Sequence, residues 1–375
     1  MKSELKNICD LINEKISANE LINDNLASTY VSTESMLPNK RGITKPSSIP
    51  SKGTTTAYKK DDVLVSNIRP YFKKIWSANY DGVCSNDVLV FRAKNTADAN
   101  FLYYVLANDD FFVYSMATSK GTKMPRGDKA SIMKYEVESF DLNTQRKIAS
   151  ILKPIDKKIE LNNAINNNLE QQAQAIFKSW FIDFEPFSNR KPSEWSVSTL
   201  GNVSIMGAGG DKPQNVSPIK TDLYEYPIYS NGLSNEGLYG FTDKPKISEE
   251  SVTVSARGTI GFVCLRHIPY VPIVRLVTLI PKTEIISAKY LYLWLKQLHI
   301  TGTGTTQQQL TVPDFQKTEI LVPSQEIVTL FTATVEPIFE KIWFNQNENE
   351  KLSSLRDTLL PKLMTGELDV SDTEI

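Results

Sequence analysis

Few residues in this sequence are of the kinds that catalysis and metal binding usually require. Histidine occurs only at His267 and His299, which leaves too few residues for a His-dependent nucleophile triad or an HExxH zinc site. The three cysteines, Cys9, Cys84 and Cys264, are odd in number, widely separated and without a CxxC pair. We interpret them as buried small side chains in a reducing compartment, and we expect no metal site.

Long apolar runs are absent as well. One of the longest, from Val271 to Ile280, is interrupted by Pro272 and Arg275, whereas a membrane-spanning helix needs about 20 apolar residues. The N-terminus has neither the apolar segment nor the small-residue cleavage site of a secretory signal. We therefore expect a cytoplasmic protein without membrane contact. With 375 residues, 41% of them apolar, the chain is long enough for two or three packed domains.

Motifs for nucleotide binding and DNA chemistry are also missing. The chain has no GxxxxGK(S/T) loop, and Gly302–Thr305 is followed by threonine and glutamines, which argues against helicase and ATPase functions. Gly207–Asp211 lacks the GxGxxG spacing of a dinucleotide site, and no Asn-Pro-Pro-Tyr or Asp-Pro-Pro-Tyr sequence for base methylation is present. Asp156–Lys158 has the DxK form of a nuclease, but its place in a heptad pattern indicates a solvated charge cluster. The sequence predicts a binder or a ruler without catalytic machinery.

The most informative feature that is present is an internal repeat. A shift of 183 residues aligns Pro154 with Pro337, and upstream a shift of 189 residues aligns Phe101–Leu106 with Tyr290–Leu295. A period of half the chain indicates two similar modules related by approximate twofold symmetry, rather than a solenoid of short repeats.

Each module begins with a strand-rich part followed by one amphipathic helix. The strands are predicted from short β-branched runs, which are Val63–Ser66, Val88–Phe91, Val252–Ser255 and Ile273–Ile280. The helices are predicted at Asn100–Asn108 and Lys289–Leu298. The expected class is α+β, with two mixed, strand-rich domains.

A long helix with a heptad pattern follows in each module. Its apolar positions are separated by 4, 3 and 4 residues. In the first helix they are Ile148, Leu152, Ile155 and Ile159, continued by Leu169, Ala173, Ile176 and Trp180. In the second they are Phe331, Val335, Ile338 and Ile342, continued by Leu352, Leu355, Leu359 and Leu363. A helix of about 36 to 40 residues spans roughly 50 Å, so we expect two spacers that form an antiparallel coiled coil.

Two features interrupt this pattern. Pro154 and Pro337 should each kink or restart their helix, because proline removes a main-chain hydrogen bond. The asparagines of residues 162–168 have weak helix propensity. They mark either a weak point of the helix or a polar contact in the seam.

The charge distribution permits a DNA-binding surface. Residues 324–375 carry a net charge of −6 and the rest of the chain +5. Lysine can neutralise phosphates, arginine can bind guanine with two hydrogen bonds, and glutamine can do so with adenine. Candidate contacts cluster in loops of the first module: Arg69, Tyr71, Lys73, Lys74, Lys120, Lys123, Arg126 and Lys129. Those of the second module are Lys244, Lys246, Arg257, Arg266, Gln307, Gln308 and Gln309.

Longer segments carry a resemblance to a known family. They are Gln145–Ala149 followed by Ile155–Ile159, Leu169–Phe184, Trp195 with Leu200–Val203, and Leu360–Leu368. In these segments, over essentially its full length, the chain resembles the specificity subunit of type I restriction-modification enzymes. The resemblance implies two target recognition domains that each bind one half of a split DNA sequence, and helices that set the gap and dock methyltransferase subunits.

The resemblance also implies the division of the chain and of the chemistry. Target recognition domains are expected at 1–142 and 191–323, spacer helices at 143–190 and 324–368, and a tail at 369–375. The partners would be double-stranded DNA with a bipartite target, two methyltransferase subunits, and restriction/translocase subunits where these exist. No cofactor is expected on this chain, because AdoMet, ATP and Mg²⁺ would belong to the partner subunits.

Two points remain open at the level of sequence. The second module begins with Trp195, whereas the first begins at Glu4–Ile8 without tryptophan, so the first strand of the first module is expected to be shorter or differently packed. Two other functions also remain as alternatives, a coiled-coil adaptor without a DNA role and a standalone DNA-modifying enzyme.

Overall fold

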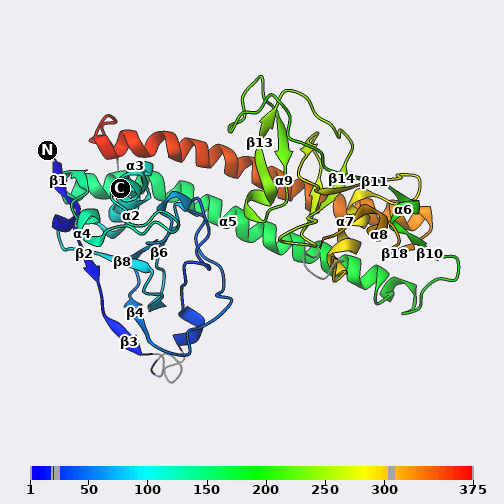
Figure 1. Ribbon diagram of the computed structural model, residues 1–375, viewed down its shortest axis with the longest axis horizontal. Coiled ribbons are helices and arrows are strands. Elements are labelled where there is room, and N and C mark those ends of the chain that lie inside the picture. The colour runs from blue at the N-terminus through cyan, green and yellow to red at the C-terminus, as the bar shows by residue number, and fades with distance from the viewer. Residues whose placement is uncertain (1, 18–19, 21–25, 303–308, 374–375) are drawn as a thin grey trace. The chain divides into compact units, whose positions relative to one another are not determined.

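The chain forms two compact units, Met1–Asn162 with Asn347–Ile375 and Asn163–Gln346. The computed structural model, drawn in Figure 1, describes residues 2–17, 20, 26–302 and 309–373. Each unit contains a strand-rich domain and one segment of each of two long helices, α5 (Leu142–Phe181) and α9 (Gln325–Thr365). The expected α+β class with two strand-rich domains is confirmed.

The first unit contains nine strands and several short helices among its described residues. The strands are β1 (Lys2–Glu4), β2 (Cys9–Ile12), β3 (Lys15–Ser17), β4 (Thr54–Tyr58), β5 (Val63–Ser66), β6 (Ile75–Ser77), β7 (Gly82–Cys84), β8 (Val88–Ala93) and β9 (Glu136–Glu138). The short helices are η1 (Leu5–Asn7), η2 (Leu26–Thr29), η3 (Pro70–Phe72), α2 (Ala99–Ala107), α3 (Asp109–Ala117) and α4 (Lys129–Ile132).

The second unit has nine strands in its described part as well. These are β10 (Ser196–Thr199), β11 (Ser204–Ala208), β12 (Tyr226–Tyr229), β13 (Leu238–Thr242), β14 (Ser251–Val254), β15 (Val263–Arg266), β16 (Val271–Pro272), β17 (Val277–Pro281) and β18 (Glu319–Val322). Its short helices are η4 (Glu185–Phe187), α6 (Leu200–Val203), η5 (Ser234–Gly237), α7 (Ala288–Gln297) and α8 (Val312–Phe315).

The sheets show that the repeat extends to topology. The four-stranded sheet has the order β2-β8-β5-β6 in the first unit and β11-β17-β14-β15 in the second, and the pairs β1-β9 and β10-β18 also correspond. The small sheets differ, because β7 joins β4 in antiparallel pairing whereas β16 joins β12 in parallel. The first strand, β1, is one residue shorter than its counterpart β10. The two modules thus share a scaffold and diverge at its edges.

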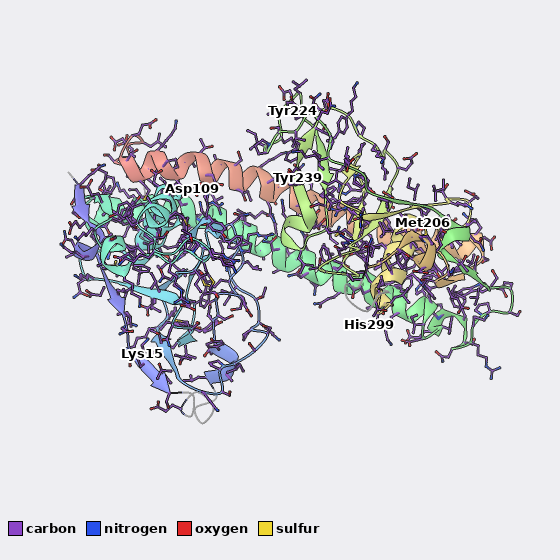
Figure 2. All side chains as sticks on the ribbon, in the orientation of Figure 1. Lys15, Asp109, Met206, Tyr224, Tyr239 and His299 are labelled. Atoms are coloured by element: carbon purple, nitrogen blue, oxygen red, sulfur yellow. The ribbon has the colours of Figure 1, made fainter. Side chains whose placement is uncertain are left out.

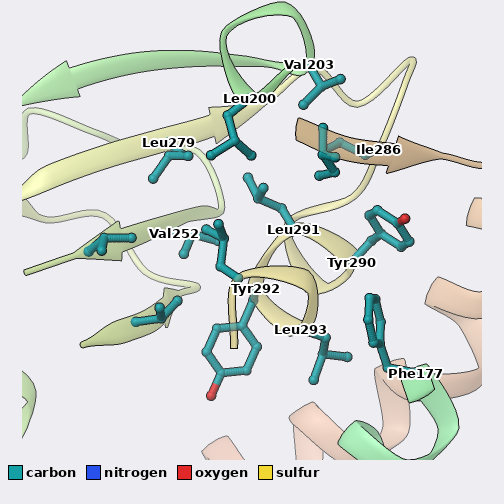
Figure 3. Close-up of a cluster of buried hydrophobic side chains, with 14 of the residues drawn as sticks. Phe177, Leu200, Val203, Val252, Leu279, Ile286, Tyr290, Leu291, Tyr292 and Leu293 are labelled. Atoms are coloured by element: carbon teal, nitrogen blue, oxygen red, sulfur yellow. The ribbon is translucent and has the colours of Figure 1, made fainter. Parts of the chain in front are cut away.

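Each unit buries its own hydrophobic core. In the second unit, Tyr290 and Leu291 of α7 lie between the four-stranded sheet and the long helices, as Figure 3 shows, and Phe177 of α5 contacts the ring of Tyr290. Phe331 of α9 packs against both rings. In the first unit, Phe101 and Leu102 of α2 belong to the corresponding core. Each recognition scaffold is therefore anchored on both long helices.

The long helices agree with the heptad pattern in length and run antiparallel within each unit. Helix α5 has 40 residues and α9 has 41. In the first unit Leu152 packs in the same core as Leu360, and in the second Trp180 contacts Phe331. The prediction that proline would restart the helices is wrong, since α5 continues through Pro154 and α9 through Pro337. Packing along the seam offsets the single main-chain hydrogen bond that each proline removes.

Three other sequence-based predictions need correction. Leu355 was assigned to the seam but is 48% exposed. The run 273–280 is not one strand, because Val274 and Arg275 adopt positive φ and β17 begins only at Val277. Asp156 is not part of a solvated charge cluster, because it binds Arg356 at 2.9 Å and accepts a hydrogen bond from a tyrosine. Across the described ranges, no helix is both long and apolar enough to cross a membrane.

Candidate nucleic-acid interface

Two loops meet at one end of the four-stranded sheet in the first unit. Residues 67–74 connect β5 to β6, and residues 118–129 connect α3 to α4. The amide of Gly127 donates to the carbonyl of Asn67 at 3.2 Å, and the amide of Arg69 donates to the carbonyl of Pro125 at 2.8 Å. We call these two segments the first loop pair.

The second unit contains the same junction. The amide of Leu310 donates to the carbonyl of Ala256 at 3.0 Å. Leu310 is Gly127 shifted by 183 residues, and Ala256 is Asn67 shifted by 189. Residues 255–262 and 309–311 therefore form a second loop pair at an equivalent place. The repeat conserves the main-chain contact and changes the side chains around it.

The first loop pair presents most of the predicted basic residues of its module. Arg69, Lys120, Lys123, Arg126 and Lys129 are all exposed. Lys120, Arg126 and Lys129, together with Asn67, line a hollow of about 680 Å³. The sequence analysis missed Asn67, because a single asparagine next to a β-branched run carries no signal of its own. The first loop pair combines cations and polar groups around one concave surface.

Acidic partners hold two of these cations in place. Lys120 Nζ lies 2.5 Å from Asp128, and the guanidinium of Arg126 lies 3.3 Å from Asp87. The hydrogen bond from Lys120, with those from Ser131, lowers the pKa of Asp128 to about 2. Asp128 also caps the N-terminus of α4. These pairs orient the cations and leave their outer faces in solvent.

The remaining candidates of the first module have different environments. Tyr71 is 49% exposed beside Phe72. Lys73 binds Asp109 at 2.6 Å, and Lys74 donates to the carbonyl of Thr33 at 2.6 Å. Burial lowers the pKa of Lys74 below its ordinary value. Lys73 and Lys74 therefore fix the loop, whereas they were predicted as freely exposed cations.

Arg257 and Gln309 meet in the second loop pair. The guanidinium of Arg257 donates twice to Oε1 of Gln309, at 3.1 and 2.7 Å. Lys244 and Lys246 are exposed between β13 and β14. Gln307 and Gln308, also predicted as contacts, lie outside the described residues.

Arg266 has to be removed from the candidate contacts. It is only 3% exposed, and its guanidinium lies 3.6 Å from the ring centroid of Tyr229. It donates to Thr253 and to both the carboxylate and the carbonyl of Glu236. A buried guanidinium with these partners serves the packing of the unit, because it cannot reach a ligand at the surface.

The structure offers little for catalysis or metal binding in its described part. No group of three or more His, Cys, Asp and Glu side chains that could hold a metal ion is found among the described residues. Cys9, Cys84 and Cys264 are buried, and burial raises the pKa of each thiol to about 12. Such thiols are poor nucleophiles at neutral pH.

Comparison with known families decides the assignment. The family model described as the type I restriction modification DNA specificity domain matches the chain twice, over residues 1–171 and 192–354. The chain belongs to this family. The two matches correspond to the two modules of the repeat, so both copies are specificity domains, and the chain is a specificity subunit of the type I restriction-modification class.

Individual specificity subunits are similar along most of the chain. The type I restriction enzyme HindI specificity subunit of Haemophilus influenzae is 28% identical, over 83% of this chain and 87% of its own length. The MjaIX specificity subunit of Methanocaldococcus jannaschii is 27% identical, over 74% and 71%. The crystal structure of a type I S subunit from M. genitalium covers 97% of this chain and 96% of its own, with a TM-score of 0.54 and 18% identity. That likeness supports the fold.

Proposed function

We propose that each loop pair reads one half of a bipartite duplex DNA target. The observation that carries this proposal is the repeated junction, in which the Gly127–Asn67 bond recurs as the Leu310–Ala256 bond. Equal scaffolds with unequal side chains are what two different half-sites require, because main-chain geometry positions the loops and side chains read base edges. The reading domains are residues 1–142 and 191–323.

The side chains of each loop pair divide into two roles. In the first, Lys120, Lys123 and Lys129 supply point charges for phosphates, while Arg69 and Arg126 are suited to guanine or phosphate. In the second, Gln309 orients the guanidinium of Arg257, and a fixed guanidinium discriminates between bases better than a mobile one. Lys244 and Lys246 add phosphate contacts. Because the overall charge is −1, affinity depends on these local clusters.

The long helices would set the gap between the half-sites. Residues 143–190 and 324–368 contain the spacer helices, and residues 369–375 are a tail. Helices of 40 and 41 residues give roughly 60 Å each at about 1.5 Å per residue. The duplicated outer faces of the helices would dock two methyltransferase subunits, one for each module. Adenine methylation with AdoMet, and ATP- and Mg²⁺-dependent translocation and cleavage by restriction subunits, would then belong to other chains.

The proposal is tested by expressing the chain with its neighbouring methyltransferase subunit in a host free of adenine methylation. Modified bases are then mapped across the host DNA. A split motif with methylated adenines in both halves is expected. A stable complex that modifies nothing would favour an adaptor without a DNA role, and methylation or cleavage by the purified chain alone would favour a standalone enzyme.

A matched pair of variants assigns the first half-site. Arg69→Ala with Arg126→Ala removes two exposed arginines of the first loop pair, and Lys157→Ala with Lys351→Ala removes two exposed lysines of the long helices. The first change should relax or abolish the motif through its first half. The second change should leave both halves as they are in the unaltered complex.

A further inference from the structure

An exposed pair of aromatic rings lies at the tip of the first loop pair. Tyr71 and Phe72 form η3 and are 49% and 37% exposed. Their ring centroids are 4.6 Å apart with an interplanar angle of 50°. Other large aromatic side chains of this unit, such as Phe91 and Phe101, are almost completely buried. Two adjacent rings held in solvent point to a binding role rather than to folding.

The backbone on both sides of these rings is held in a strained conformation. Arg69 and Lys73 have φ values of 51° and 50°, in the left-handed region that non-glycine residues seldom adopt. Such strain persists only where surrounding contacts impose it. It is therefore a sign that the position of the rings is fixed.

Main-chain and ionic contacts impose this conformation. The carbonyl of Phe72 accepts from the amide of Asn39 at 2.8 Å, and that of Lys73 accepts from the amide of Lys40 at 2.9 Å. Lys40 and Lys73 both bind Asp109, at 2.8 and 2.6 Å; Figure 2 labels this residue at the start of α3. Since the rings are already fixed, little conformational entropy is lost when a ligand covers them.

Cations surround the rings. Arg69 precedes them in the same loop, and Lys74 Nζ lies 5.8 Å from the ring centroid of Phe72. Arg126 belongs to the loop that binds Arg69 through the main chain. Apolar rings inside a cationic rim complement a polyanion that also offers flat aromatic faces. Nucleic-acid bases flanked by phosphates meet that description, whereas an apolar protein groove would leave the cations unmatched.

The second unit has the same loop without the rings. The amide of Ser66 donates to the carbonyl of Lys74 at 3.0 Å, and that of Ser255 donates to the carbonyl of Phe262 at 3.0 Å. With Arg69 aligned on Arg257, Tyr71 and Phe72 correspond to Thr259 and Ile260. The loop closure is equal in the two units, and only the first presents two stacked aromatic side chains.

We propose that Tyr71 and Phe72 stack on partly unstacked bases and so distort the half-site read by the first module. The inference rests on the proposed function, and it adds that the two half-sites are bound differently. Side chains that enter a base step exchange base stacking for contact with the protein. The second half-site, which meets threonine and isoleucine, would keep its regular stacking at the corresponding step.

Fluorescent base analogues test this proposal in the complex of the full chain with its methyltransferase subunits. 2-Aminopurine for adenine, or pyrrolocytosine for cytosine, is placed at one base pair at a time in both half-sites. The methylated adenines are omitted because methyltransferases flip their target base. The complex should brighten the probe at one step of the first half-site, and Tyr71→Ala with Phe72→Ala should abolish this signal at saturating protein. Affinity should fall by about 10-fold or more, given stacking of about 1–3 kcal/mol per base.

Three further variants make the result decisive. Tyr71→Phe keeps the ring and should keep the signal, and Tyr239→Ala removes a ring of equal exposure, 49%, from the other unit and should also keep it. An equal signal with and without the rings would overturn the proposal. So would loss of the methyltransferase subunit from the double alanine variant during gel filtration, because the rings would then dock a protein. Failure of the unaltered complex to modify any DNA would instead refute the proposed function, and this inference with it.

Discussion

Asn162 donates a hydrogen bond from Nδ2 to Oδ1 of Asn349 at 2.9 Å, across the two long helices of the first unit. A shift of 183 residues carries Asn162 onto Asn345 and Asn166 onto Asn349. In the second unit, Asn345 correspondingly donates to Asn166 at 2.8 Å. Asn162 and Asn345 are each 1% exposed. The duplication thus repeats a buried polar pair, which in coiled coils fixes helix register at some cost in stability.

Replacing these donors should loosen the register. Asn162→Leu with Asn345→Leu removes both polar pairs and adds apolar surface to the seam. We expect the free energy of unfolding to change by no more than about 2 kcal/mol, because lost hydrogen bonds and gained packing oppose each other. The gap between methylated half-sites should become heterogeneous in length. Methylome sequencing measures the gap directly, and one unchanged gap length would show that these asparagines do not fix the register.

Asp109 should make the first module sensitive to acid. Burial opposes its charge, but hydrogen bonds and charges from Lys40 and Lys73 outweigh burial and hold its pKa below the ordinary value of 3.8. A lowered folded-state pKa stabilises the fold above the unfolded pKa, and this stabilisation is lost as the pH falls through the folded value. Asp109→Asn should therefore unfold at a lower urea concentration than the unaltered protein at pH 6, and the difference should shrink below about pH 4.

Asp110→Asn is the matched control for this change. It removes a carboxylate from the same first turn of α3, and no ion pair of Asp110 is found among the described residues. Its urea midpoint should stay closer to that of the unaltered protein at pH 6. Equal losses from both variants would assign the effect to the helix terminus rather than to Lys40 and Lys73.

The buried and exposed arginines of the second module should behave oppositely. Arg266→Met removes the cation that binds Glu236 and stacks on Tyr229, and should lower the free energy of unfolding by about 2–3 kcal/mol. Arg257→Met, at an exposed position, should change it by less than about 0.5 kcal/mol. DNA affinity should fall by about 10-fold for Arg257→Met. Urea titration and DNA titration would refute the reassignment of Arg266 if that variant stayed fully stable and lost only binding.

The two modules should be exchangeable one at a time. Replacing residues 195–323 with the corresponding part of a relative should change one half of the modified motif and leave the other half and the gap as they were. This follows because each unit buries its own core. Modification mapping of the chimaera checks it, and a change in both halves would show that the modules do not read independently.

Periodic features of this protein were predictable from sequence, whereas contacts between distant residues were not. The 4, 3, 4 spacing of Ile148 and its successors predicted α5, and the same spacing from Phe331 predicted α9. Local spacing reports which face of a helix is apolar. It did not report that Leu355 is exposed, because burial there depends on what the rest of the fold places against it.

The candidate interface shows the same division. A cluster of basic residues in two loops was visible in the sequence, and the structure brings those of the first module together around one hollow. The burial of Arg266 was not visible, because its partner Glu236 lies 30 residues away and Tyr229 comes from another strand. The ion pair of Asp156 with Arg356 spans 200 residues. A charge that is read without its partners looks like surface.

The most direct test of the account is to lengthen both helices between the two asparagine pairs. Seven residues would be inserted between residues 163 and 164 and seven between 346 and 347, so that each pair stays within its own unit and the heptad phase is kept. The insertion adds roughly 10 Å at about 1.5 Å per residue, or about three base pairs at about 3.4 Å each. The account predicts a modified motif with both halves unchanged and a gap about three base pairs longer. The original gap in the lengthened protein would contradict it.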